Sequence, residues 1–531
     1  MYSSHLTVLE SSASAHATSS VFQIPQLEAS SNRVASWRSI TYQEFHRHVE
    51  VYARHWTRVL RSDGIPIKSV VGLWLSGFTY TDVLHIYGIS RAGYIPQLFS
   101  LRLPNPEVVY ELLNRAGAKA LVYDASFETI LSACPVPVHR ALYTEDIPVV
   151  EESLPDISRI NADETAFIFH TSGSTSGSPK LVHCSYRWLD VVVQKSYSIS
   201  MPRDFSRQDV TVFMGSMCHI AQNFMLIGTL QHGSCVVQPT VIAFPTEELI
   251  DMILRCRLNR LNQFPTFLAG HLRKSREDPK LLSLLSNLDD VLYSGLPLSR
   301  EEEQWAFKNG IKLRNLFGST EVGGMLLSGS HERNPALLRP LEGVSYAFVP
   351  TASSQGESAY QSTTTLYELV ILAESPDCPD PSLRHADGNF HTGDLFQEVT
   401  PGFYLSRGRD DDWIKSENSL RCDTKAIEDN VRTTCGSLIA ECIVVGSGRP
   451  SPVMFIEPAV DMDHDKLKKD IIRKTRQFHS RRYLHERITS TDMIVVVPRL
   501  TLPRTATKGN IRRKAVEDAF KTQIDKIFGC A

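Results

Sequence analysis

Short apolar runs that alternate with amphipathic segments constrain the fold of this chain more than any other feature. Val70–Leu75, Tyr94–Phe99 and Ala120–Tyr123 have the character of buried strands, whereas Asp82–Ala92 and Pro106–Ala116 have helical spacing. Buried strands separated by helices are typical of parallel sheets covered by helices on their faces. The sequence therefore predicts an α/β fold whose sheets are mainly parallel.

The same alternation continues beyond this segment. Further strands are predicted at Val210–Phe213, Cys235–Gln238, Val291–Tyr293 and Leu369–Leu372. A chain of 531 residues is too long for one compact core, so we expect a large and a small domain with a boundary near Ser406–Asp412.

Three parts are predicted along the chain. Residues 1–36 are rich in Ser, Ala and His and are expected to be a loosely ordered lead-in. Residues 37–408 are expected to form the large domain, and residues 409–531 a small α+β domain. The elements predicted in the small domain are a helix at Lys425–Val431, a strand at Cys442–Val445, a basic helix at His464–Arg482 and a strand at Met493–Val497.

Composition excludes several classes of protein. The chain carries 56 basic and 59 acidic residues, a net charge of −3, so nothing indicates a nucleic-acid partner. No apolar run is long enough to span a membrane, and the start Met1–His5 lacks a signal-peptide pattern, so we expect a cytoplasmic protein without a membrane partner. The scattered cysteines form no zinc-binding pattern and are expected to be reduced thiols.

A loop rich in glycine and small hydroxyl residues covers residues 171–180, with the sequence TSGSTSGSPK. Glycines let a backbone approach an anion, hydroxyl and N–H groups donate to phosphate oxygens, and Lys180 adds a positive charge. An apolar run at Ala166–Phe169 predicts a strand before the loop, and Tyr186–Val193 predicts a helix after it. Pro179 stands where an ordinary P-loop has glycine, which disfavours a P-loop NTPase. A flexible surface loop is the alternative interpretation.

Three further segments follow in order: Phe317–Glu321 (FGSTE), His391–Leu395 (HTGDL) and Gly408–Lys415 (GRDDDWIK). Taken singly, they are also typical of a helix cap, a turn and a charged loop. Together with the loop at 171–180, they resemble the ordered core motifs of the adenylate-forming superfamily, which includes acyl-CoA synthetases, nonribosomal peptide synthetase adenylation domains and luciferases.

The resemblance covers nearly the whole chain, because Ile40–Phe45 and Pro503–Thr505 also look like landmarks of this family. The amino-acid sequence of Gly408–Asn430 most resembles that of fungal nonribosomal-peptide-synthetase-like enzymes and adenylate-forming reductases. The resemblance implies a large AMP-binding domain with an acyl pocket and a small mobile C-terminal lid. It also implies the activity, which is ATP-dependent conversion of a carboxylic acid into an acyl-adenylate, with Mg²⁺ as the metal.

The resemblance assigns roles to individual residues. Those implied to line the triphosphate are Thr171, Ser172, Gly173, Ser174, Thr175 and Lys180. Thr320 is implied to contact the α-phosphate and Glu321 to hold Mg²⁺, a hard ion that prefers oxygen ligands. Phe317 is implied to stack on adenine, Asp394 to accept from the ribose hydroxyls, and Arg409 to reach the ribose or the phosphates.

The catalytic lysine of the family follows a Pro-x-Thr pattern near the C-terminus. Here the sequence after Pro503 reads RTATKGN, with the family's Gly-Lys order exchanged, and Lys508 is the candidate. Lys514 is the rival. The hinge aspartate of the lid corresponds to Asp411. Two departures stand out: the phosphate loop is one residue longer than the common form, and Asn418 replaces an expected glycine.

The acyl pocket is represented by the segment Met217–Ile220. By resemblance, His219 gates the pocket, and the next position carries an aspartate in relatives that activate α-amino acids. Ile220 cannot pair with an ammonium, and burial of an unpaired ammonium is costly. We therefore expect an aryl, aliphatic or keto acid as the small-molecule substrate, rather than a free α-amino acid.

The acyl group is expected to pass to a thiol, either of coenzyme A or of the phosphopantetheine arm on a carrier protein. No carrier, reductase or condensation domain is recognisable up to Ala531, so a carrier is expected to act in trans. The alternative function is a non-catalytic nucleotide-binding regulator, motivated by the exchanged Lys-Gly order and by Asn418. A P-loop kinase or ATPase ranks third.

Overall fold

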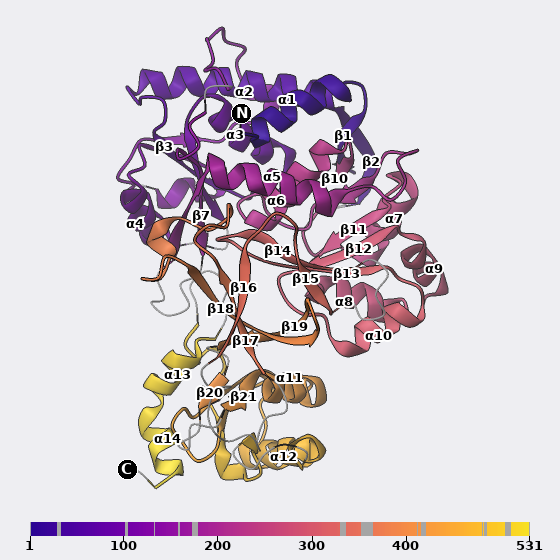
Figure 1. Cartoon of the computed structure of the whole chain (residues 1–531), viewed down its shortest axis with the longest axis vertical. Coiled ribbons are helices and arrows are strands. Elements are labelled where there is room, and N and C mark those ends of the chain that lie inside the picture. The colour runs from indigo at the N-terminus through magenta and orange to yellow at the C-terminus, as the bar shows by residue number, and fades with distance from the viewer. Residues whose placement is uncertain are drawn as a thin grey trace.

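The computed structural model covers most of the chain. It describes residues 2–28, 33–100, 103, 105–131, 133–157, 160–171, 179–329, 336–351, 365–410, 413–415, 421–480, 482, 486–504 and 511–529. The N-terminal helices and the C-terminal segment lie at opposite ends of its long axis (Figure 1). Within the described residues, no helix combines the length and the apolarity that crossing a membrane requires.

A six-stranded sheet carries the predicted alternation of strands and helices. Its order is β6 (Val138–Arg140), β5 (Ala120–Tyr123), β3 (Val70–Leu75), β4 (Ile95–Ser100), β7 (Thr165–Thr171) and β8 (Lys180–Ser185). All neighbours are parallel except β8, which runs antiparallel to β7. The helices α3 (Tyr80–Arg91) and α4 (Pro106–Ala116) connect its parallel strands. The strands and helices predicted between residues 70 and 123 are thus confirmed.

The prediction of a loosely ordered lead-in over residues 1–36 is wrong. Helix α1 (His5–Ala15) begins at a capping box formed by Ser4 and Thr7, and it buries Leu6 and Leu9 in the largest core cluster. The helical period is weak in this segment because many of its residues are Ser or Ala. The two leucines are buried because α1 packs against α2 (Tyr42–Ser62) and α6 (Ile220–Gln231), which are distant in the sequence.

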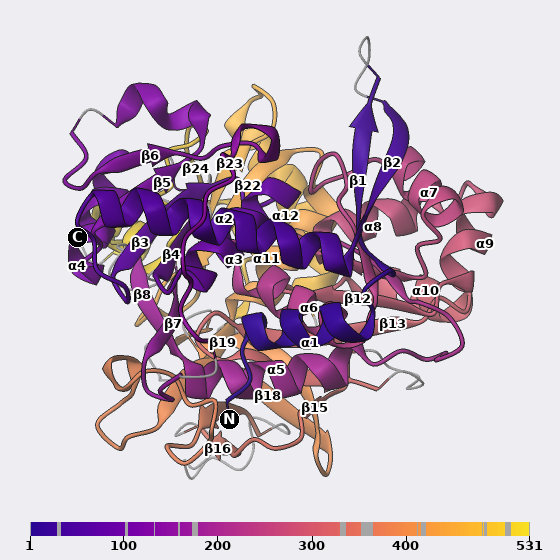
Figure 2. The same ribbon diagram turned by 90° about the horizontal axis from the view of Figure 1, so that it is seen from above.

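A four-stranded sheet follows the lead-in helix. Its order is β2 (Val34–Thr41), β1 (Ser20–Leu27), β10 (Cys235–Val237) and β9 (Val210–Val212). The antiparallel β1–β2 hairpin extends from the rest of the molecule (Figure 2), and β1 continues into parallel pairing with β10. Thr41 then caps α2 in a second capping box, with Glu44 accepting the Thr41 N–H at 2.8 Å.

A nine-stranded sheet changes from parallel to antiparallel along its width. Its order is β11 (Arg260–Gln263), β12 (Asp290–Ser294), β13 (Leu313–Ser319), β14 (Gly323–Ser328), β15 (Leu338–Pro340), β19 (Phe403–Arg409), β18 (Phe390–Thr400), β17 (Tyr367–Ile371) and β16 (Tyr346–Pro350). Only β11, β12 and β13 are parallel. From β13 onward the neighbours are antiparallel, and the pairs β13–β14 and β18–β19 are hairpins with short turns. The prediction of mainly parallel sheets therefore describes the first half of the large domain better than the second.

Helices complete the large domain. They are α5 (Tyr186–Ser200), α7 (Thr246–Arg255), α8 (Pro265–Lys274), α9 (Pro279–Asn287) and α10 (Arg300–Lys308). Proline at the first turn of α8 and α9 fits these starts, because that position needs no N–H donor.

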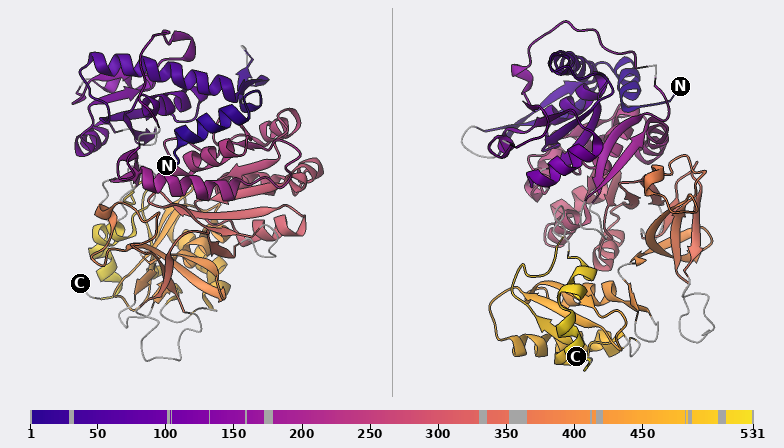
Figure 3. Two further views of the ribbon diagram at one scale, coloured as in Figure 1. Left: turned by 45° about the horizontal axis from the view of Figure 1, so that its top comes forward. Right: turned by 90° about the vertical axis from the view of Figure 1, so that its left-hand side faces the viewer.

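The C-terminal part lies below the nine-stranded sheet (Figure 3). It contains a ribbon of β20 (Trp413–Lys415) and β21 (Arg421–Asp423), and a three-stranded sheet of β22 (Ile439–Val445), β23 (Val453–Pro458) and β24 (Ile494–Val496). Its helices are α11 (Thr424–Cys435), α12 (His464–Ser480), α13 (Arg513–Ala519) and α14 (Lys521–Ile527). The helices and strands predicted here are confirmed, and they bury a core of their own.

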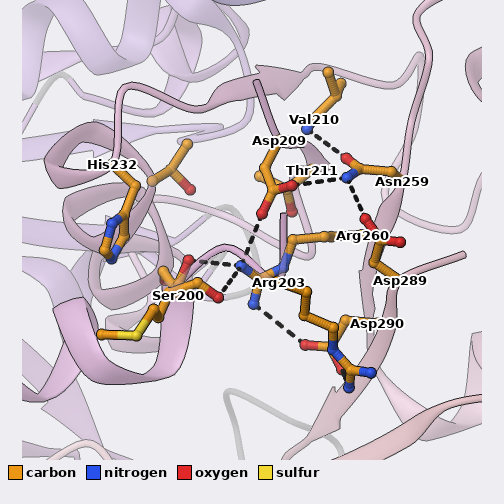
Figure 4. A network of polar contacts seen from close by, with 12 residues as sticks. Ser200, Arg203, Asp209, Val210, Thr211, His232, Asn259, Arg260, Asp289 and Asp290 are labelled. Carbon is orange, nitrogen blue, oxygen red and sulfur yellow. Dashed lines mark hydrogen bonds and ion pairs between the residues drawn. The ribbon is translucent and has the colours of Figure 1, made fainter. Parts of the chain in front are cut away.

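A buried polar network joins the four-stranded sheet to the nine-stranded sheet (Figure 4). Arg260, at the start of β11, pairs with Asp209 before β9 at 3.1 Å and with Asp290 on β12 at 3.2 Å. Asn259 donates to Asp209 at 2.7 Å. The carboxyl ends of these parallel strands point away from the network, so we assign it a structural role.

Candidate active site

Two antiparallel strands, β7 and β8, flank the glycine-rich segment in the sequence. Thr171, the last residue of β7, faces Lys180, the first residue of β8, as a cross-strand pair. The guanidinium of Arg115 on α4 donates to the carbonyl of Pro179 at 3.1 Å. The predicted strand and helix on either side are confirmed, but a second strand separates the loop from α5. Ser172, Gly173, Ser174 and Thr175 lie outside the described residues. The pairing places Thr171 and Lys180 on the same face at the mouth of the loop.

The Phe317–Glu321 segment covers the end of β13 and the start of the turn that leads into the antiparallel strand β14. A Cβ added at Gly318 would lie 2.5 Å from the carbonyl oxygen of Gly323, which explains the need for glycine where the strands approach. Thr320 and Glu321 are half-buried at the tip of the turn. Their side chains are therefore presented by a hairpin with little freedom to move.

Helix α5 holds the backbone that follows Glu321. The indole N–H of Trp188 donates to the Glu321 carbonyl at 3.1 Å, and the ammonium of Lys195 donates to the Val322 carbonyl at 2.8 Å. Lys195 also pairs with Asp377 at 2.8 Å, and both side chains are almost completely buried. Burial lowers the pKa of Lys195, while Asp377 opposes this effect. Sequence reasoning missed these two donors, because no local pattern links α5 to the turn.

Asp394 and Arg409 lie side by side on β18 and β19. They are cross-strand partners, with 3.6 Å between Oδ1 of Asp394 and Nη1 of Arg409. Arg409 also donates to the carbonyl of Thr392 at 3.1 Å. Phe317 packs edge-on against Phe396, with ring centroids 5.1 Å apart. This contact connects the turn that bears Glu321 with the strand that bears Asp394.

The predicted acyl-pocket residues lie at the start of α6. His219 is the N-cap of this helix, and its Nδ1 accepts from the Ala221 N–H at 3.2 Å. Its ring meets the edge of Phe264, with centroids 6.4 Å apart, and a Cβ added at Gly215 would lie 3.0 Å from the Phe264 ring. Ile220 is buried. Phe264 was missed by sequence reasoning and lies beside the predicted gate.

The predicted lid residues are only partly described. Asp411 and Lys508 lie outside the described residues. The segment that contains Lys508 is closed at its base by a bridge between Arg504 and Ile511. Arg504 pairs with the buried Glu457 at 2.6 Å, which anchors this base to β23. Lys514 lies on α13 and pairs with Asp518.

A magnesium ion fits the charge of this region. Among the residues that the structure describes, no group of three or more His, Cys, Asp or Glu side chains could hold a metal ion by itself. Mg²⁺ is often bound by one or two carboxylates together with substrate phosphates. The single carboxylate of Glu321 on its restrained turn meets that requirement.

Comparison with known proteins identifies the family. Residues 20–349 match the family described as AMP-binding enzyme, and residues 411–530 match the AMP-binding enzyme C-terminal domain. The AMP-binding domain-containing enzyme iboA of Amanita muscaria is 37% identical over 514 residues, which cover 94% of this chain and 98% of that protein. The adenylate-forming reductase Nps10 of Heterobasidion annosum is 22% identical, and the match spans 93% of this chain but 47% of the reductase.

Solved structures share the fold at low sequence identity. The o-succinylbenzoate CoA synthetase of Bacillus subtilis, in complex with its acyl-adenylate intermediate, superposes with a TM-score of 0.75 at 16% identity and covers 97% of this chain and 98% of its own. The anthranilate CoA ligase AuaEII, in complex with anthranoyl-AMP, gives a TM-score of 0.74 at 18% identity, with 98% of both chains covered.

Proposed function

This chain belongs to the family of AMP-binding enzymes, and we propose that it activates a carboxylic acid lacking an α-amino group and transfers the acyl group to a thiol. Enzymes of this family form acyl-adenylates from ATP with Mg²⁺. The proposed substrate is an aryl, aliphatic or keto acid. The proposed acceptor is coenzyme A or a carrier protein acting in trans. The fungal relatives support a place in fungal secondary metabolism.

The observation that carries the proposal is a set of contacts that links three segments. Lys180 begins β8, α5 follows the other end of that strand, and Trp188 of α5 donates to the Glu321 carbonyl. The Asp394 strand is tied to the same turn by the contact of Phe317 with Phe396. This arrangement supports Lys180 at the phosphates, Glu321 at Mg²⁺ and Asp394 at the ribose of one nucleotide.

The chemistry requires charge neutralisation at the phosphates. A carboxylate is a poor electrophile, and transfer of AMP gives it a better leaving group. Thr171, Lys180 and Thr320 would donate to phosphate oxygens, and Lys508 would bring a cation to the α-phosphate, where negative charge develops. Bound Mg²⁺ would supply further neutralisation through the oxygen ligand Glu321. Arg409 and Asp394 orient the sugar side, and Asp411 is proposed as the hinge of the lid.

The apolar Ile220 supports the choice of acid. An α-ammonium bound beside a buried isoleucine would lose water without gaining a counter-charge, and a penalty of roughly 3 kcal/mol corresponds to more than a hundredfold in affinity. Phe264 adds an aromatic surface beside His219. Both neighbours favour a substrate whose carbon skeleton is apolar.

A pyrophosphate-exchange screen tests the proposal. We expect exchange with an aryl or keto acid to exceed that with the matching α-amino acid by at least about tenfold, or 1.4 kcal/mol. Ile220→Asp should narrow this difference, because it restores a partner for the ammonium. Equal exchange with a free amino acid would refute the role of Ile220. The absence of exchange with every acid would favour the regulatory alternative instead.

A further inference from the structure

His391 lies between two carboxylates beside the turn that bears Asp394. Its Nδ1 is 3.1 Å from Oε2 of Glu368 on β17, and its Nε2 is 3.1 Å from Oδ2 of Asp387 in the loop before β18. The ring of His385 stacks on it, with centroids 4.5 Å apart. These are the titratable groups seen to face His391 among the described residues. A half-buried imidazole in this position can donate to both carboxylates only when it is protonated.

Glu368 connects this ion pair to the backbone of the turn. While Oε2 faces His391, Oε1 accepts the backbone N–H of Gly393 at 3.1 Å. Gly393 has a φ of +70°, a conformation that other residues rarely adopt, so the turn depends on a specific backbone arrangement. The orientation of the Glu368 carboxylate therefore affects the backbone position of Gly393, the residue directly before Asp394.

The remainder of the turn is equally restrained. The Thr392 hydroxyl donates to the carbonyl of Leu369 at 2.8 Å and accepts from the Asp394 N–H at 3.0 Å. Arg409 donates to the Thr392 carbonyl from the other side. Several contacts with the neighbouring backbone thus position Asp394. Among them, the Glu368–Gly393 hydrogen bond also involves a histidine, because Glu368 pairs with His391.

We propose that Glu368 and His391 are positioning residues which hold Asp394 for the ribose of the nucleotide, and that protonated His391 strengthens this hold. The inference rests on the proposed function, since it assigns the ribose contact to Asp394. It goes beyond that function, because the affinity for the nucleotide would depend on pH through Glu368 and His391, which do not contact the nucleotide.

The expected direction of the pH dependence follows from the charges. Burial lowers the pKa of His391, but hydrogen bonds and charges from Asp387 and Glu368 outweigh it, so the pKa lies above its usual value. The pKa of Asp387 is lowered to about 2, chiefly by its hydrogen bond to His391. When the pH rises through the pKa of His391, the ring loses one of its two donors and both carboxylates lose their counter-charge. Affinity for the nucleoside should therefore fall with rising pH.

Adenosine is the suitable probe, because it lacks the phosphate groups that themselves titrate near pH 6. We would measure its dissociation constant by calorimetry between pH 6 and pH 8.5. The unmodified enzyme should bind about fivefold more weakly at the upper end, which is the effect expected for one lost hydrogen bond. The His391→Gln variant should bind adenosine with nearly the same affinity across this pH range. Asp387→Asn should shift the transition to lower pH, because it removes one carboxylate that stabilises the imidazolium.

The matched control is His139→Gln. His139 pairs with Asp63 at 2.7 Å, and its side chain is exposed to a similar degree, but it lies on the six-stranded sheet away from Asp394. This variant should retain the pH dependence of the unmodified enzyme. Binding of adenosine that does not vary with pH, or equal pH dependence in His391→Gln, would overturn the inference and leave the proposed function intact. An unmodified chain that binds neither adenosine nor AMP would overturn both.

Discussion

Two lysines near the C-terminus are candidates for the cation at the α-phosphate, and their surroundings differ. Lys514 is 82% exposed and pairs with Asp518 at 3.0 Å, one helical turn along α13. Its partner also raises the pKa of Lys514. The segment that contains Lys508 joins Arg504 to Ile511, and Arg504 is anchored to the buried Glu457. Arg504 is thus anchored at one end of the segment that contains Lys508, whereas Lys514 belongs to an exposed ion pair on a helix.

We therefore predict that Lys508→Ala reduces the rate of pyrophosphate exchange by about a hundredfold to a thousandfold, the usual effect of removing one preorganised donor at a developing charge. ATP binding should persist. Lys514→Ala is the internal control and should change the rate less than about twofold, since exposed ion pairs contribute little. The assignment would be reversed if Lys514→Ala were the inactive variant.

At the scale of elements, α5 adds side-chain contacts to the β13–β14 turn that bears the proposed Mg²⁺ ligand, beyond the pairing of these two strands. Trp188 and Lys195 lie two turns apart on the same face of this helix and donate to consecutive carbonyls, those of Glu321 and Val322. Because α5 also follows β8, whose first residue is Lys180, it links the strand after the glycine-rich loop to the proposed Mg²⁺ ligand.

The matching prediction uses two tryptophans. Trp188→Phe removes the indole donor but keeps an aromatic ring, and we expect the Mg²⁺ concentration for half-maximal exchange to rise about threefold to tenfold, for a loss of about 1 kcal/mol. Glu321→Gln should raise this half-maximal Mg²⁺ concentration further, because it removes the proposed anionic metal ligand. Trp305→Phe removes a similar donor, because Trp305 on α10 donates to the hydroxyl of Ser275 at the end of α8 at 3.0 Å, and this variant should leave the Mg²⁺ dependence unchanged. Equal effects from both tryptophans would refute a positioning role for α5.

Periodicity predicted the elements well where burial follows a regular pattern, continuous in a central strand or one-sided in a helix. The run Val70–Leu75 is a buried central strand, and Pro106–Ala116 is a helix with its proline in the first turn. Contacts between distant segments were not predictable. Lys195 and Asp377 are 182 positions apart, and neither lies in a recognisable pattern. Their pairing joins α5 to the segment between β17 and β18, a contact that no local pattern encodes.

At the scale of the whole molecule, five buried histidines make the stability of the fold depend on pH. Burial lowers the pKa of His5 and His85 to about 3, and that of His170, His271 and His479 to about 4. Each pKa is depressed in the folded state, so each histidine favours folding above its unfolded pKa of about 6.5. That contribution is lost as the pH falls, by about 1.4 kcal/mol per pH unit for each group. We expect stability to decrease steeply between pH 6.5 and pH 4, as urea unfolding at several pH values would show.

His5 gives the sharpest test, because it joins the N-terminal helix to the core without a polar partner. Its ring packs on Tyr87 and Phe167 at 4.9 and 4.6 Å, and neither ring nitrogen has a hydrogen-bond partner in the described part of the chain. His5→Phe keeps an aromatic ring there and removes both unpaired nitrogens.

We expect His5→Phe to stabilise the fold by about 1 to 3 kcal/mol at pH 8. At pH 5 the gain should be about 2 kcal/mol larger, because the unfolded wild-type chain then binds a proton at His5 that the folded chain excludes. Urea midpoints at the two pH values measure this difference. His464→Phe, at the exposed start of α12, should give no such pH-dependent gain. If His5→Phe unfolds at the same urea concentration as the unmodified protein at pH 5, His5 is not a neutral member of this core.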